Sequence, residues 1–255
     1  MASLSGSLSE SKVRRTGPAA CPTGWLLLGL LLVAAPALAG NPAYLREALA
    51  GFDPAVPGGW AYTLKTERDG RQTVERCDPA KAAAAQWTLL LTDGRPPTSA
   101  ELEKYAKYKA GQAGGATEGS FRKSDIEPGS LVLVSEDSRW AEYRGAFREQ
   151  AANSDKMLGH LALLLRICKE PAYVEKYTLV LRDAYSPVLG VKMKELTAEM
   201  IFTAPTDDRP VLPWRNRSHF RGRLFFWPIT EDLRLTYSDF VRPPSRADRD
   251  SPAGE

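Results

Sequence analysis

The feature that most restricts the fold is an alternation of side chains with a period of two, which recurs along most of the chain. It is clearest in residues 60–67, where Trp60, Tyr62 and Leu64 alternate with small or charged residues. Successive side chains of a β-strand point to opposite faces of a sheet, so the pattern predicts a strand with one buried face. Asp69-Gly70 follows it as a predicted two-residue hairpin turn.

Similar patterns predict further strands, separated by short turns, almost to the end of the chain. These strands cover residues 72–77, 87–92, 131–135, 140–147, 161–167, 173–181, 191–202, 219–226 and 233–241. The apolar run at 161–167 also fits a buried helix, but its hairpin partner at 173–181 favours a strand.

Capping residues predict two helices early in the chain. Asn41 is a suitable N-cap and Gly51 a suitable C′ residue for a helix at 42–50, whose apolar side would pack on a sheet as a plug or as a structural cap. Thr98 and Glu101 form a capping box that starts a second helix, ending near residue 112. A helical turn is expected within 144–154, and a Gly/Ala-rich loop at 110–120. The predicted fold is mainly β (α+β), an open antiparallel β half-barrel of about ten strands with two or three short helices.

The N-terminal residues have the features of a secretory signal peptide. Lys12, Arg14 and Arg15 precede an apolar run at 25–35, and an A-x-A site ends at Ala39. The apolar run is shorter than the roughly 20 residues that a membrane-spanning helix needs. The predicted domains are therefore a signal peptide at 1–39, one open-barrel domain at 40–242 and a disordered tail at 243–255. The mature protein is expected in the periplasm, and the long n-region leaves the true start codon open.

The charge of the mature chain argues against nucleic-acid binding. Residues 1–39 hold three of the 34 Lys and Arg residues and one of the 31 Asp and Glu residues, so the rest of the chain is close to neutral. Proteins that bind phosphate backbones usually carry a basic field. Cys77 and Cys168 would remain in an oxidising compartment, where they could form a disulfide or stay as separate buried thiols. No zinc-ligand spacing is present, so neither a metal nor a cofactor is expected.

Three segments carry a resemblance to known proteins. They are DGRPPT before the second helix, YSPVLGVKMKEL, and FRGRLFFWPITEDLRLTYSDF near the C-terminus. Together they resemble a family of uncharacterised exported proteobacterial proteins, which in turn look like the LolA/LolB-like lipoprotein-carrier fold. The resemblance implies an unclosed antiparallel barrel around helices, over most of residues 41–242. It transfers no functional residue.

The sequence contains no recognisable catalytic motif. GxSxG, HExxH and the phosphate-binding GxxxxGKS/T pattern are all absent. His160, His219 and the Glu231-Asp232 pair are better explained as structural or solvated groups than as catalysts. We therefore expect no enzymatic activity, and an unrecognised hydrolase is the weakest alternative.

Two sets of side chains are candidate binding surfaces. One is a predicted hydrophobic concave face, which would hold a lipid or acyl chain or else form an ordinary core. Its residues are Trp60, Tyr62, Trp87, Trp140, Tyr177, Met200, Phe202 and Phe226. The other is a row of arginines at even spacing on the late strands, which would face an anion, a partner or solvent. Its residues are Arg215, Arg217, Arg221 and Arg223.

These patterns favour an exported, non-enzymatic binding protein for a lipid or an acylated protein. The alternative is a structural or partner-binding envelope protein whose barrel interior is fully packed. The sequence leaves three points open, namely the existence of a ligand cavity, the identity of the ligand and the oligomeric state.

Overall fold

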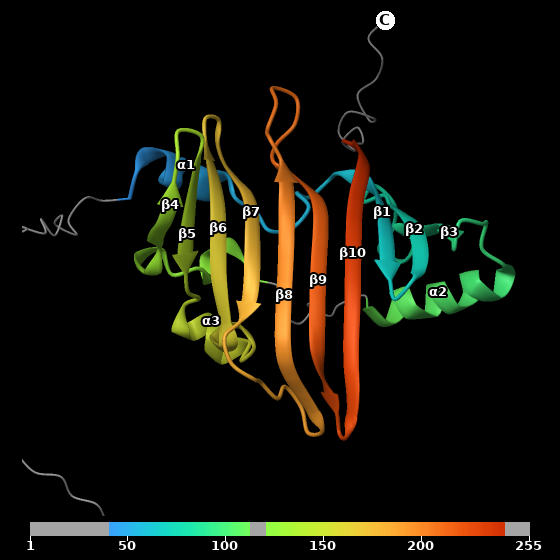
Figure 1. Cartoon of the computed structure of the whole chain (residues 1–255). Coiled ribbons are helices and arrows are strands. Elements are labelled where there is room, and N and C mark those ends of the chain that lie inside the picture. The colour runs from blue at the N-terminus through green and yellow to red at the C-terminus, as the bar shows by residue number, and fades with distance from the viewer. Residues whose placement is uncertain (1–40, 113–120, 243–255) are drawn as a thin grey trace, which may run out of the picture. The chain divides into compact units, whose positions relative to one another are not determined.

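Ten antiparallel strands form one sheet, in the order β3-β2-β1-β10-β9-β8-β7-β6-β5-β4 (Figure 1). Their bounds are β1 Ala61–Arg68, β2 Arg71–Cys77, β3 Trp87–Thr92, β4 Val132–Glu136, β5 Trp140–Gly145, β6 Leu161–Lys169, β7 Ala172–Leu181, β8 Val191–Thr203, β9 Leu212–Leu224 and β10 Trp227–Val241. β3 and β4 are the two edges and do not pair, so the sheet is open. The predicted class, an open antiparallel half-barrel with few helices, is confirmed.

The computed structural model describes residues 41–112 and 121–242. These residues belong to the unit Gly40–Glu255, and the predicted signal segment, residues 1–39, lies outside the described residues. The predicted tail and residues 113–120 of the predicted loop also lie outside them. The described α-helices are α1 Ala43–Gly51, α2 Ser99–Gln112 and α3 Glu149–Ser154, and the last is the predicted helical turn.

The helix α1 is confirmed, but its predicted ends are wrong by one residue. Pro42, not Asn41, is the N-cap, and it makes no side-chain capping bond. Gly51 belongs to the helix, and the chain leaves in extended conformation at Phe52. Leu45 and Ala48 are buried, and α1 packs on β6 and β7. Tertiary packing of this apolar side therefore sets where the helix ends, more than the caps do.

The start of α2 follows the predicted capping box. The backbone N–H of Thr98 donates to Glu101 Oε2 at 2.7 Å, and the N–H of Glu101 donates to Thr98 Oγ1 at 3.3 Å. Arg95 and the Thr98 hydroxyl also donate to the Glu101 carboxylate, the latter at 2.9 Å. These two bonds and the one from the Thr98 N–H lower the pKa of Glu101 to about 2. The box and Arg95 thus join the β3–α2 connection to the helix.

Both late strands begin earlier than predicted. β9 starts at Leu212 instead of residue 219, and β10 starts at Trp227 instead of residue 233. In β9 the cause is that polar residues occupy both faces: Arg215 and Arg217 alternate with Asn216 and Ser218. Without an apolar side, the period-two pattern loses its hydrophobic signal.

The two cysteines are not paired. Cys77 on β2 and Cys168 on β6 are both buried free thiols. The strands β1, β10, β9, β8 and β7 lie between them in the sheet. A disulfide between these two positions is therefore excluded by the topology, because bridged Cα atoms lie within about 7 Å.

The turn between β1 and β2 gives a test of the hairpin. Asp69 and Gly70 have φ values of 49° and 79°, the left-handed region that glycine favours. We expect Gly70→Val to lower the free energy of unfolding by about 1–3 kcal/mol, because a β-branched residue is strained there. Gly58→Ala is the control, since Gly58 lacks a positive φ and an added Cβ meets no atom within 4 Å. Chemical denaturation measures both, and equal stability of the two variants would contradict the turn assignment.

Candidate functional site

The strand register places the side chains of the sheet on two chemically different faces. On one face, a row of directly opposed residues crosses seven neighbouring strands. From β5 to β1 this row is Tyr143, Leu165, Tyr177, Met200, Asn216, Leu235 and Thr66. The face that carries it includes most of the buried core, and we call it the inner face. The opposite, outer face is largely charged.

The helix α1 packs on the inner face over β6 and β7. Phe52, at its C-terminal end, lies 5.7 Å from the Phe202 ring and 6.1 Å from the Tyr177 ring, both in edge contacts. Met200 belongs to the same buried cluster, and burial raises the pKa of Tyr177. Three of the predicted hydrophobic residues therefore come together as predicted, but they are packed against the protein itself.

A second aromatic group lies at the other end of the sheet, near α2. The Tyr62 and Trp87 rings make an edge contact at 5.8 Å, and Lys109 of α2 places its Nζ 3.8 Å from the Trp87 ring centre. The same Nζ donates to Glu75 Oε2 at 3.0 Å. Burial raises the pKa of Tyr62. Trp60 is also buried, directly before β1.

Between these two ends, the inner face carries half-buried apolar side chains. The main helix contacts are those of α1 with β7 and β6, and of α2 with β3. The strands β8, β9, β10 and β1 lie between these contacts in the sheet. We call five of their half-buried inner-face apolar residues the central stripe: Leu196, Phe220, Leu233, Leu235 and Leu64. Beside it, burial raises the pKa of Tyr237 to about 12.

Two predicted members of the hydrophobic face lie elsewhere. Trp140 is on the outer face, where it contacts the Arg166 guanidinium at 4.7 Å, while its neighbour Ala141 is fully buried on the inner face. Phe226 is 92% exposed, at the turn between β9 and β10. Neither residue can therefore line an inner-face site.

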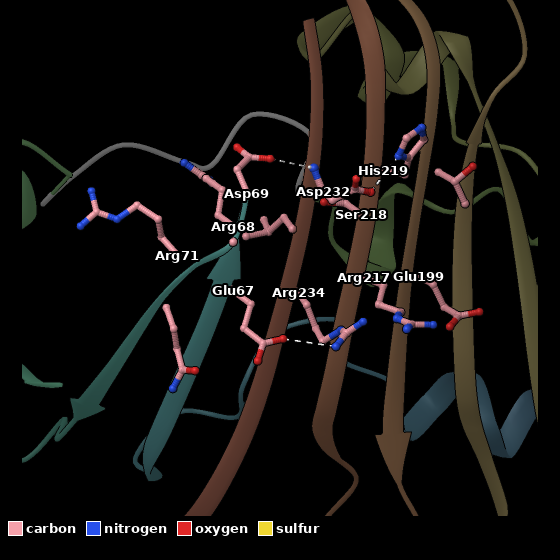
Figure 2. Close-up of a pocket in the computed structure, with 14 residues that line it drawn as sticks. Glu67, Arg68, Asp69, Arg71, Glu199, Arg217, Ser218, His219, Asp232 and Arg234 are labelled. Atoms are coloured by element: carbon pink, nitrogen blue, oxygen red, sulfur yellow. Dashed lines mark hydrogen bonds and ion pairs between the residues drawn. The ribbon is translucent and has the colours of Figure 1, made fainter. Parts of the chain in front are cut away.

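The outer face has a groove of about 770 Å³ near the β1–β2 hairpin (Figure 2). It contains a charged row of directly opposed residues, Glu67 on β1, Arg234 on β10, Arg217 on β9 and Glu199 on β8. Glu67 accepts a hydrogen bond from Arg234 at 3.2 Å, and Lys176 lies 3.2 Å from Glu199. Arg217 lies between Arg234 and Glu199 in the row, as Figure 2 shows.

The predicted arginine row does share one face, but its members have different surroundings. Arg215, Arg217 and Arg221 are opposite Ile201, Glu199 and Glu195, and Arg221 is ion-paired with Glu195. Arg223 is directly opposite Lys192 near the end of the sheet. Of the four, only Arg217 lines the groove. Sequence reasoning missed Glu67 and Arg234, whose strands are far apart in the sequence and adjacent only in the sheet.

The groove also contains a histidine and a carboxylate within hydrogen-bonding distance. His219 Nδ1 lies 2.8 Å from Asp232 Oδ1, and Thr197 is directly opposite His219 on the other side. Both members of the pair are exposed, and the groove mixes basic and acidic groups. It is suited to a polar or zwitterionic partner, in contrast to the inner face.

The described residues offer no obvious metal site or membrane span. Within 41–112 and 121–242, no group of three or more His, Cys, Asp or Glu side chains is placed to hold a metal ion. In the same ranges, no helix is both long and apolar enough to cross a membrane.

Comparison with known proteins does not identify a family. No family model matches the chain, and no curated protein matches it. Among solved structures, an isomerase-inactive variant of GphF DH1 aligns at 8% identity and a TM-score of 0.17, covering 80% of this chain and 81% of that one. A GphF dehydratase variant aligns at 10% identity and a TM-score of 0.13, covering 76% and 81%. Likeness at this level carries no information on fold or activity.

Proposed function

We propose that this chain is a non-enzymatic binding protein that holds a lipid or acyl chain against the inner face of its open sheet. The observation that carries the proposal is the central stripe, where five apolar side chains are only half-buried and lie between the helix-covered ends. Burial of each ligand methylene contributes about 0.8 kcal/mol, so an acyl chain of ordinary length can bind without any catalytic group. Tyr237 and Asn216 beside the stripe supply polar contacts for a headgroup.

Export is part of the proposal. The basic residues, apolar run and A-x-A site before Gly40 support a cleaved signal peptide and a periplasmic location. In that compartment the ligand would be a lipid or an acylated protein. The resemblance to the lipoprotein-carrier fold remains a prediction from the sequence.

A polar partner on the outer groove is the second candidate. It is favoured by Arg217, whose guanidinium is exposed and directly opposite the like charge of Arg234. Like charges directly opposite each other destabilise a sheet. Glu67 and Glu199 flank this pair in the row, and an anionic group of a partner would compensate it further. A structural or partner-binding envelope protein would use this groove, and its inner face would bind no ligand.

A polar substitution in the central stripe separates the two candidates. Leu235→Asn should weaken the binding of a fluorescent long-chain fatty acid by about tenfold, since a buried leucine contributes about 1.5–3 kcal/mol. Val74→Asn is the control, because Val74 is half-buried and lies on the outer face, opposite Lys65. Fluorescence titration measures the affinity and circular dichroism checks the fold. Unchanged affinity in a folded Leu235→Asn protein, or no binding by the wild type, would contradict the proposal.

A further inference from the structure

The sheet has a projecting part formed by the ends of three strands. β7 pairs with β8 only between Lys176↔Ile201 and Val180↔Thr197, whereas β8 and β9 stay paired as far as Val191↔Leu224. On the other side, β1 pairs with β10 only as far as Arg68↔Leu233. Beyond these limits β8, β9 and β10 continue together, and they extend past their neighbours at the lower end of Figure 1. We call this part the tongue.

Exposed apolar residues are concentrated at the end of the tongue. They come from the β9–β10 turn and from the loop before β8, and we call them the apolar tip: Val188, Leu189, Leu224, Phe225, Phe226 and Trp227. Leu189 is 97% exposed, Phe226 92% and Trp227 74%. The N–H of Phe225 donates to the carbonyl of Gly190 at 2.5 Å, so the two segments form one surface. Clustered exposure of this kind marks an interaction surface.

The turn residues themselves conflict with ordinary hairpin chemistry. Leu224 pairs with Trp227, so Phe225 and Phe226 are the two loop residues. Two-residue hairpin loops favour Asn, Asp and Gly, and this chain uses Asp69-Gly70 in the β1–β2 hairpin. Phe225 has a φ of 53°, a strained value for an aromatic residue. The choice of phenylalanine here therefore serves something other than the stability of the turn.

Two basic residues, which we call the basic collar, lie beside the tip, and acidic residues are absent from both segments. Lys192 and Arg223 are directly opposite each other, and no ion pair of either occurs within the described ranges. The segments 186–192 and 223–228 contain no Asp or Glu. Two adjacent cations without a counter-charge are suited to bind phosphate groups. An apolar tip with aromatic residues and a basic collar is the pattern of a surface that inserts into the interface of an anionic bilayer.

We propose that the apolar tip docks this protein onto an anionic lipid bilayer, with Phe226, Trp227 and Leu189 in the interface and Lys192 and Arg223 on the headgroup phosphates. A bilayer fits better than a protein groove because the apolar side chains lie at the far end of the tongue (Figure 1) and are highly exposed. The charged residues beside them are all basic, whereas a protein interface usually has a polar rim of both signs. This inference does not depend on a cargo on the inner face.

The test is flotation of the full chain with vesicles of phosphatidylglycerol and phosphatidylcholine. The double variant Phe226→Ser, Trp227→Ser should lower the partition coefficient onto the vesicles by about tenfold, because two aromatic side chains are no longer buried in the bilayer. Val132→Ser with Val134→Ser is the matched control, since these residues on the edge strand β4 are 56% and 59% exposed. This control should bind vesicles as the wild type does. All proteins compared carry the same N-terminal segment, so any binding through that segment does not affect the comparison.

A second pair of variants tests the basic collar. Lys192→Glu with Arg223→Glu should lower binding by about fivefold or more at low salt, with a smaller effect on pure phosphatidylcholine vesicles. Arg144→Glu, at an exposed position on β5, should have little effect.

A third experiment measures tryptophan fluorescence in vesicles that contain brominated lipid. The lipid should quench the wild-type fluorescence, and the quenched component should be the one that Trp227→Phe removes. The proposal would be overturned if the Phe226→Ser, Trp227→Ser variant bound vesicles as the wild type does, or if brominated lipid did not quench the fluorescence. It would also be overturned if the substitutions abolished self-association of the protein and left vesicle binding unchanged.

Discussion

Replacing Phe52 with alanine is expected to lower the free energy of unfolding by about 3–5 kcal/mol. Phe52 is 2% exposed and its ring contacts Phe121, Tyr177 and Phe202. Removing it leaves a cavity among three aromatic rings and loosens the attachment of α1 to the sheet. Because α1 packs on β6 and β7, the substitution tests whether the helix is an integral part of the core.

Chemical denaturation followed by circular dichroism measures this loss. Phe226→Ala is the matched control, since it removes the same side chain from a position that is 92% exposed. The control should change stability by less than about 0.5 kcal/mol. A loss for Phe52→Ala no larger than that of the control would mean that α1 does not pack on the sheet as described.

The second large effect is expected at the α2 end of the sheet. Lys109→Ala should lower the free energy of unfolding by about 3 kcal/mol, because it leaves the Glu75 carboxylate buried without its counter-ion. Glu75 is 8% exposed, and Lys109 Nζ lies 3.0 Å from its Oε2. The variant also removes the contact of this cation with the Trp87 ring.

The control for this prediction is on the same helix. Lys107 is ion-paired with Glu103 at 2.8 Å, but that pair is exposed. Lys107→Ala should therefore cost only about 0.3–0.5 kcal/mol. Replacing both buried partners, as Lys109→Met with Glu75→Leu, should restore much of the lost stability. Equal losses for Lys107→Ala and Lys109→Ala in chemical denaturation would contradict a buried pair that fixes α2 to the sheet.

Local chemistry made much of the fold predictable. Asp69-Gly70 marks a turn, because glycine adopts a positive φ without strain. Thr98 with Glu101 marks a helix start, because their side chains bond the free backbone N–H groups there. The strand at 161–167 was correctly preferred over a helix because its predicted hairpin partner was recognised. These signals act over a few residues and need no knowledge of the tertiary structure.

The candidate site was only partly predictable, for two physical reasons. The side-chain direction on β5 depends on register, and Ala141 and Tyr143 face inward while the larger Trp140 faces outward. Phe226 was placed in a strand because a turn made of two phenylalanines carries no turn signal. Residues that meet only across the sheet, such as Glu67 and Arg234, cannot be paired from spacing along the chain.

The location of a bound acyl chain can be observed by methyl NMR with a fatty acid that carries a nitroxide label. If the ligand lies on the central stripe, the methyl signals of Leu233 and Leu235 should broaden, because both side chains are half-buried on the inner face. Leu163 on β6 lies four strands from β10 in the sheet, so its signal should broaden much less. Broadening confined to Leu189 at the apolar tip, or no broadening at all, would contradict a ligand on the inner face.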